Sequence, residues 1–154
     1  MKNIYLYFGL FILIASCSQE SNLQINLEQS ETFLLSNAAK DGVISLEDGL
    51  QFSVIESGDI NQSPPELSET ITAHFHGTLM DGSVFWSSVE MGDPLIIQLS
   101  QLIPGCQKVI SKMRAGDLWR VFIHPSLAYG EEGRPTIPPN STLIFDIELI
   151  NIAG

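Results

Sequence analysis

The side chains that could do acid, base or nucleophilic chemistry are few and scattered in this sequence. His74 and His76 lie two residues apart, which would place both imidazoles on one face of a strand and could suit a metal ion. Neither a third His nor a Cys lies near them, and a metal site needs more ligands than two. The acidic pairs Glu131–Glu132 and Glu47–Asp48 lie in predicted loops, where solvated charge is the simplest interpretation. No Ser stands in a nucleophile elbow and no Gly-rich phosphate loop is present, so we expect neither a metal nor a cofactor.

Aromatic and branched apolar residues, by contrast, are concentrated where predicted strands end or turn. They are Phe75, Phe85, Trp86, Leu102, Ile103, Tyr129, Ile137 and Phe145. A plain hydrophobic core is the alternative interpretation, and for Phe75 or Phe145 taken alone it would be sufficient. Any site built from this group would be an apolar one.

Length, composition and charge restrict the class of protein. The chain has 154 residues, which corresponds to one folded domain, and its 44% of hydrophobic residues excludes disorder throughout. Eighteen acidic residues against seven basic ones give a formal net charge of -11. Because phosphate would be repelled and no stripe of Lys or Arg reverses this locally, we expect no nucleic-acid partner.

The N-terminus has the pattern of a bacterial lipoprotein signal. Lys2 is followed by residues 4–15, an uncharged apolar run too short to span a bilayer as a helix. The run ends at Leu13-Ile14-Ala15-Ser16-Cys17, which resembles a lipobox, in which the Cys becomes the acylated first residue of the mature chain. A buried core helix and an ordinary signal peptide are the alternatives. We therefore expect residues 1–16 to be a signal peptide and Cys17 to anchor the chain to a membrane.

The lipobox also indicates a compartment. It places the mature chain in the bacterial cell envelope, facing the periplasm or the cell surface, and Ser18 after the Cys favours the outer membrane by the enterobacterial sorting rule. Cys106 would then be the only thiol of the folded part, so no disulfide can form within the chain.

The remaining elements follow from hydrophobic periodicity. Residues 17–48 read as a polar tether up to about residue 29 and a short helix over 30–40, with Ser30 as its N-cap. Within 49–154, alternation predicts strands at 50–55, 70–76, 84–86, 95–99, 118–123 and 142–150. An apolar stripe at i, i+3, i+4 and i+7 predicts one helix over 106–113. Several alternating strands with one amphipathic helix indicate an α+β fold with an antiparallel sheet.

Four segments in order give the chain a resemblance to the FKBP family of peptidyl-prolyl cis-trans isomerases, over residues 49–152. They are Ala73–Phe85, Leu102–Gly105, Ser126–Gly130 and Ile137–Leu149. Residues 33–43 are similar to the linker of secreted bacterial members of the macrophage-infectivity-potentiator type. The resemblance implies five or six antiparallel strands curled around the helix, with a proline pocket between helix and sheet.

The resemblance also implies which residues form that pocket. Carried over position by position, they are Phe75, Phe85, Leu95, Ile97, Leu102, Ile103, Cys106, Tyr129, Ile137 and Phe145, with Trp86 at the edge. In the family, the backbone N–H at the Ile103 position and the hydroxyl at the Tyr129 position donate hydrogen bonds to carbonyls of the ligand. The implied activity is rotation about X–Pro bonds in proline-containing peptides or unfolded envelope proteins, which needs no cofactor.

The chain departs from the family pattern within this pocket. Phe75 replaces a common Tyr, Trp86 replaces a common Asp, Cys106 replaces the common Trp of the floor, and Arg134 stands at a variable position. These changes remove polar contacts and a large indole platform, so we expect weak binding of macrolide inhibitors. Two functions remain open at this point: an isomerase, with activity reduced by these changes, and a binding module or chaperone that keeps the fold with little turnover.

Overall fold

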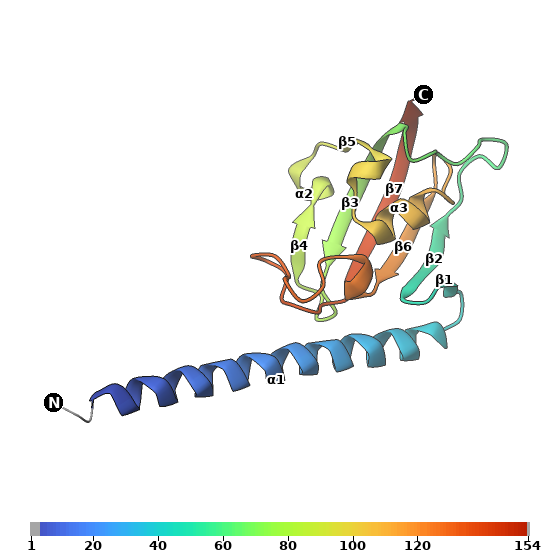
Figure 1. Ribbon diagram of the computed structural model, residues 1–154. Helices are drawn as coiled ribbons and strands as arrows, with labels where there is room; N and C mark the ends of the chain where they lie inside the picture. The colour runs from blue at the N-terminus through green and yellow to red at the C-terminus, as the bar shows by residue number, and fades with distance from the viewer. Residues whose placement is uncertain (1–3, 154) are drawn as a thin grey trace.

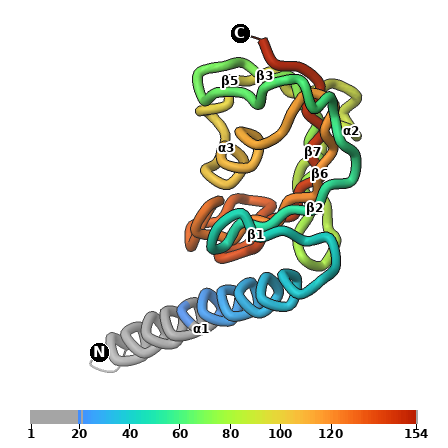
Figure 2. The backbone as a smooth tube through the Cα atoms, turned by 90° about the vertical axis from the view of Figure 1, so that its right-hand side faces the viewer, coloured from blue at the N-terminus to red at the C-terminus, as the bar shows by residue number. Residues whose placement is uncertain are grey.

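The computed structural model describes the backbone of residues 4–153 and the side chains of residue 20 and of 22–153. A long helix, α1 (Ile4–Ala38), lies across one end of a body made of strands and short helices (Figure 1). The view turned by 90° shows α1 at the same end (Figure 2). The chain leaves α1 at Ala38 and enters the sheet within a few residues.

The body is an antiparallel sheet that curls around one helix. Its strands are β1 (Ile44–Glu47), β2 (Leu50–Glu56), β3 (Thr70–Thr78), β4 (Val84–Ser87), β5 (Leu95–Gln98), β6 (Leu118–Ile123) and β7 (Leu143–Ala153). The order is β1-β2-β6-β7-β3-β4, and β5 pairs with β3. The predicted α+β class is confirmed. The described residues form seven strands where the resemblance implied five or six, because residues 44–47 form a further strand, β1.

Strand β3 pairs with three other strands of this sheet. It pairs along its whole length with β7, from Thr70 opposite Ala153 to Thr78 opposite Ile144. Its other edge is shared between β5 at residues 70–73 and β4 at residues 76–78. Alternate β3 side chains are buried, as the period of two in the sequence predicts.

The helix against the sheet is α3, and it is shorter than predicted. It runs over Pro104–Ile110 rather than 106–113, since Pro104 suits a first helical position. After Ile110 the backbone tightens, and the N–H groups of Lys112 and Met113 donate to carbonyls three residues earlier. Met113 is nevertheless fully buried, so the predicted apolar stripe is present although its last residue lies beyond the helix.

Three short elements complete the connections around α3. The turn of helix α2 (Ser88–Met91) follows β4, and the 3-10 turns η1 (Leu99–Gln101) and η2 (Pro125–Leu127) follow β5 and β6.

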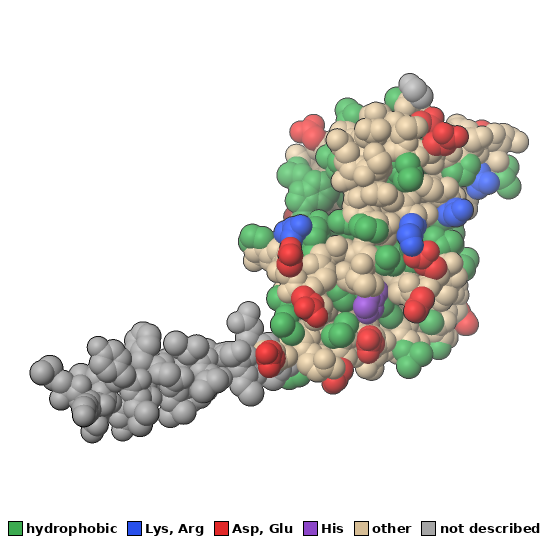
Figure 3. Space-filling view, viewed as in Figure 1, with side chains coloured by type: hydrophobic (Ala, Val, Ile, Leu, Met, Phe, Trp, Pro, Cys, Tyr) green, Lys and Arg blue, Asp and Glu red, His purple; other side chains and the backbone are tan. Residues whose placement is uncertain are grey.

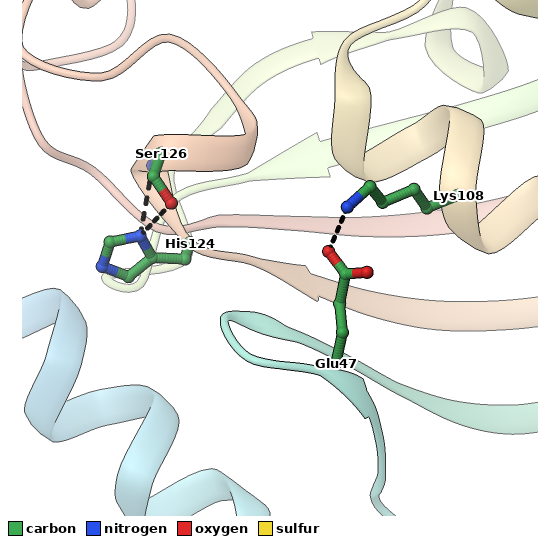
Figure 4. A network of polar contacts seen from close by, with 4 residues as sticks. All are labelled: Glu47, Lys108, His124 and Ser126. Carbon is green, nitrogen blue, oxygen red and sulfur yellow. Dashed lines mark hydrogen bonds and ion pairs between the residues drawn. The ribbon is translucent and has the colours of Figure 1, made fainter.

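Glu47, predicted to lie in a loop, is at the end of β1 and forms an ion pair with Lys108 of α3 (Figure 4). This ion pair joins the edge of the sheet to the helix.

The predicted tether is wrong, and the predicted short helix is the last part of a longer one. Residues 4–38 form one continuous helix, and Ser30 lies in its interior rather than at its start. The reason is a docking face that local propensity does not show. Ser30, Leu34 and Asn37 are buried at spacings of three and four residues, and the ring of Phe33 lies 6.2 Å from that of Phe122.

The predicted signal peptide and the side chain of Cys17 fall on residues whose side chains lie outside the described part of the chain. Among the residues that the structure describes, no helix combines the length and apolar character needed to cross a membrane.

Candidate active site

A cavity of about 370 Å³ opens between α3, four strands and the loop that follows η2. Its lining is mainly aromatic and aliphatic, and it comes from segments far apart in the sequence. The lining residues are Phe75, Phe85, Trp86, Leu95, Gln101, Leu102, Ile103, Cys106, Tyr129, Arg134, Thr136, Ile137 and Phe145. Because few polar groups face its interior, the cavity can hold an apolar ring and exclude water from it.

Three phenylalanines form the wall on the sheet side. The ring of Phe145 meets Phe75 edge to face at 6.1 Å and Phe85 edge to face at 5.3 Å. Gly77 makes this packing possible, since a Cβ at that position would lie 2.5 Å from Cζ of Phe85. The interlocked rings give the cavity a rigid apolar wall.

Cys106 forms the floor of the cavity at the start of α3. Its side chain is 2% exposed, and burial raises the pKa of its thiol to about 12. The thiol therefore stays protonated at neutral pH, and it contributes a small apolar surface rather than a nucleophile.

Trp86 stands at the edge of the cavity. Its ring lies 6.3 Å from Phe75 at a tilt of 54°, and the residue is half-buried. Both Trp86 and Cys106 line the same open volume, so the indole narrows the cavity without closing it.

Tyr129 and Arg134 line the cavity from the segment that follows η2. The guanidinium carbon of Arg134 lies 4.4 Å from the centre of the Tyr129 ring, a cation–π contact. Nδ1 of His124 accepts a hydrogen bond from Ser126 N at 3.1 Å and lies 2.8 Å from Ser126 Oγ, which fixes the turn η2 just before Tyr129 (Figure 4).

The backbone N–H of the lining residue Ile103 has no partner within the described residues. Ile103 is the N-cap of α3, and within residues 20–153 no protein group accepts a hydrogen bond from its N–H. A carbonyl of a bound ligand could accept that bond, because Ile103 itself lines the cavity.

Ten of the eleven residues predicted for the pocket line this one cavity, and Ile97 does not. The pairing of β5 with β3 explains the difference. Leu95 lies opposite Ala73, two residues from the lining residue Phe75, whereas Ile97 lies opposite Ile71, four residues from Phe75. The structure thus places Ile97 outside the lining of this cavity.

Sequence reasoning missed two polar lining residues and set aside a third. Gln101 and Thr136 are exposed on the rim, and Arg134 was treated as variable. No local pattern marks them, because their place at the cavity depends on how the 129–137 loop folds back. That loop is fixed by paired bonds between Arg134 and Ile137, with N···O distances of 2.8 and 2.9 Å.

The two histidines of β3 contact serines of the neighbouring turn. Nδ1 of His74 lies 3.0 Å from Ser88 Oγ, and Nδ1 of His76 lies 3.0 Å from Ser87 Oγ. Ser87 is in turn the N-cap of α2 and accepts a bond from Glu90 N. Among the described residues there is no group of three or more His, Cys, Asp or Glu side chains placed to hold a metal ion.

The comparisons with known proteins agree with this geometry. Residues 61–150 match the family of FKBP-type peptidyl-prolyl cis-trans isomerases, and residues 14–54 match the domain amino terminal to such isomerases. The crystal structure of FkpA from Escherichia coli superposes with a TM-score of 0.85 at 31% identity, covering 99% of this chain and 73% of that one. An isomerase from Pseudomonas syringae superposes with a TM-score of 0.78 at 30% identity, covering 85% and 96%.

Curated relatives share more of the sequence. The chain is 41% identical to the peptidyl-prolyl cis-trans isomerase Mip of Coxiella burnetii over 128 residues, which is 82% of this chain and 55% of that protein. It is 41% identical to the outer membrane protein MIP of Legionella longbeachae over 144 residues, which is 91% and 60%. The chain thus spans somewhat more than half the length of these two relatives.

Proposed function

Because this chain belongs to the family of FKBP-type peptidyl-prolyl cis-trans isomerases, we propose that it catalyses rotation about X–Pro bonds and assists the folding of envelope proteins. One observation carries this proposal: a single cavity with three interlocked phenylalanine rings, a free backbone N–H at Ile103 and the Tyr129 ring at its mouth. The substrates are proline-containing peptides and unfolded proteins, with the proline ring seated in the cavity.

The chemistry follows from amide resonance. Rotation about X–Pro must break this resonance, at a barrier of roughly 18–20 kcal/mol. The twisted amide carries less charge on its oxygen than the planar one, so a dry apolar pocket destabilises the planar form more than the twisted form. Catalysis is then stronger binding of the twisted conformation, without an acid, a base or a cofactor.

The lining residues divide this task between them. Phe75, Phe85 and Phe145 hold the proline ring, while Cys106 and Ile137 close the floor and the side. The N–H of Ile103 and the hydroxyl of Tyr129 donate to carbonyls on either side of the bond that turns. Each neutral bond of this kind contributes about 0.5–1.5 kcal/mol to binding.

NMR exchange spectroscopy on short X–Pro peptides tests the proposal. Catalytic amounts of the protein should speed cis–trans exchange, and Phe85→Ala should lower kcat/KM at least about tenfold by opening the wall. Phe33→Ala is the matched control, because Phe33 lies against Phe122 outside the cavity. If the protein speeds cis–trans exchange in none of the peptides, the proposed activity is contradicted.

The second function, a binding module with little turnover, has one observation in its favour. The floor residue is a small thiol and an indole narrows the edge, so the cavity could hold proline without favouring the twisted amide. The same experiment separates the two functions. Chemical-shift changes and line broadening on binding, without faster cis–trans exchange of the peptide, would support binding alone.

For location, the resemblance of Leu13–Cys17 to a lipobox and the likeness to the Legionella longbeachae outer membrane protein support a lipid anchor at Cys17 in the cell envelope, on the outer membrane. Two or more acyl chains would hold the protein firmly, at about 0.8 kcal/mol for each buried CH₂. Membrane fractionation of the wild type and of Cys17→Ala is the test. A wild-type chain found soluble and without lipid would overturn the anchor.

A further inference from the structure

Arg134 is the one charged residue among the described residues that line the cavity. The whole chain is acidic, with a formal net charge of -11, and acidic side chains are spread over the face seen in Figure 3. A cation at the mouth of an apolar cavity is therefore a local exception to the charge of the molecule. Because Arg134 is exposed and also lines the cavity, its side chain can contact the parts of a bound peptide that extend out of the cavity.

The guanidinium is held in place but its charge is not neutralised. It stacks on Tyr129 at 4.4 Å, and its Nη1 donates to the carbonyl of Gly133 at 2.8 Å. The nearest carboxylate within the described residues is that of Glu132, at 4.0 Å, and Glu132 is 90% exposed. Such a wide, solvated contact contributes little.

The backbone beneath Arg134 is fixed as well. Arg134 N donates to Ile137 O, and Ile137 N donates to Arg134 O, so the two residues close a tight loop. Ile137 is buried and lines the cavity. A guanidinium has five N–H donors in a planar fork, and one of them is used here by Gly133. The others remain for a carboxylate, which the fork can bind through both oxygens.

From this geometry we infer that Arg134 determines substrate specificity by favouring peptides with an acidic residue next to the proline. The inference rests on the proposed function and names the substrate class of that site. Distant acidic residues do not cancel this preference, because at physiological salt charges more than about 8 Å apart are largely screened. A carboxylate in contact with Arg134 is not screened to the same extent.

The test uses paired peptides that differ only by charge, with Glu or Gln placed either just before or just after the proline. For the full chain, kcat/KM should be higher for the Glu peptide of at least one pair, and Arg134→Met should lower that Glu-to-Gln ratio by a factor of up to about five, as loss of a partly exposed ion pair predicts. The ratio is the readout because Arg134→Met also changes the packing of Tyr129, which affects both peptides alike. Lys112→Met removes the same charge from an exposed residue outside the cavity and should leave the ratio unchanged.

Two further measurements sharpen the result. Glu132→Gln should raise the Glu-to-Gln ratio, since it removes the competing carboxylate, and added salt should lower the ratio in the wild type but not in Arg134→Met. An equal ratio in wild type and Arg134→Met for both pairs would overturn the inference. If no peptide is isomerised, the proposed activity fails, and titration of the same peptides by calorimetry still decides whether Arg134 selects acidic ones.

Discussion

The hydroxyl of Ser30 bonds to two backbone groups, one of Asn140 and one of Thr142, which lie 110 and 112 residues away in the sequence. Its Oγ donates to the carbonyl of Asn140 at 2.7 Å and accepts from the N–H of Thr142 at 3.0 Å. Ser30 is fully buried in helix α1, and the bridged segment joins the cavity residue Ile137 to the start of β7. The N-terminal helix and the wall of the cavity are thus one packed unit.

Ser30→Ala should lower the free energy of unfolding by about 1–3 kcal/mol, because it leaves a buried carbonyl and a buried N–H without partners. Urea denaturation followed by tryptophan fluorescence measures this change. Ser36→Ala is the control on the same helix, since Ser36 is exposed and bonds only to Phe33 O within its own helix. Equal stability of the two variants would show that the bridge contributes nothing.

Asn140 holds its backbone in a left-handed conformation, with φ of 54°, which among the described residues is seen at no other non-glycine. Its side chain donates to Leu23 O in α1, and its N–H donates to Gly130 O beside Tyr129. Asn140→Ala should be less stable than Asn140→Gly by about 1 kcal/mol, because both lose the side-chain bond but only Ala resists positive φ. Thermal denaturation of the two variants measures the difference. The reverse order would contradict a conformational origin.

Tyr129→Phe should weaken binding of X–Pro peptides by about 0.5–1.5 kcal/mol, the contribution of one neutral hydrogen bond. The ring would remain beneath Arg134, so the melting temperature should change little. Calorimetric titration measures the binding free energy, and thermal denaturation measures the melting temperature. Unchanged binding with a large loss of stability would identify Tyr129 as a core residue instead.

Cys106 should resist alkylation in the folded protein. With a pKa of about 12, its thiolate fraction at pH 8 is about one in ten thousand, and the side chain is buried. In a Cys17→Ala chain, where Cys106 is the only thiol, iodoacetamide should react at least about a hundredfold more slowly in buffer than in urea. Equal rates would mean that the cavity floor opens readily.

Ionisation of the Cys106 thiol should make the free energy of unfolding fall as the pH rises above 9. Burial raises the folded pKa from 9.0 to about 12, so the neutral thiol is favoured in the folded state. Its contribution is complete below pH 9 and is lost as the pH rises from about 9 to about 12, where the unfolded chain ionises first. Urea denaturation at pH 9 and pH 11 should therefore show a smaller loss of stability for Cys106→Ala than for the wild type.

The double change Trp86→Asp with Cys106→Trp should raise both turnover and affinity for macrolide inhibitors, which we expect to be weak in the wild type. A Trp in place of Cys106 could add on the order of 100 Å² of apolar contact, or ~2–3 kcal/mol at 25 cal/mol per Å². Trp86→Asp removes the ring beside Phe75 and makes room for the new one. A double variant that folds well yet gains nothing over the single variants would refute this account of the cavity.

The sequence by itself determined the elements that depend on local order. Alternation at Ile71, Ala73 and Phe75 was enough to predict β3, because a strand has a side-chain period of two wherever one of its faces is buried. The resemblance to the family then indicated ten of the cavity residues, since its four motifs carry those positions in fixed spacing.

Only the tertiary structure decided what depends on contacts between distant segments. Helix α1 extends through the predicted tether, and Ser30 in its interior bonds to a loop 110 residues away, a contact that no window of sequence contains. Ile97 does not line the cavity, and the β3–β5 register places it opposite Ile71. Arg134 does line the cavity, because its loop folds back and its guanidinium lies over Tyr129. The physical reason is the same in each case: periodicity records which face of an element is buried, whereas packing between elements decides what covers that face.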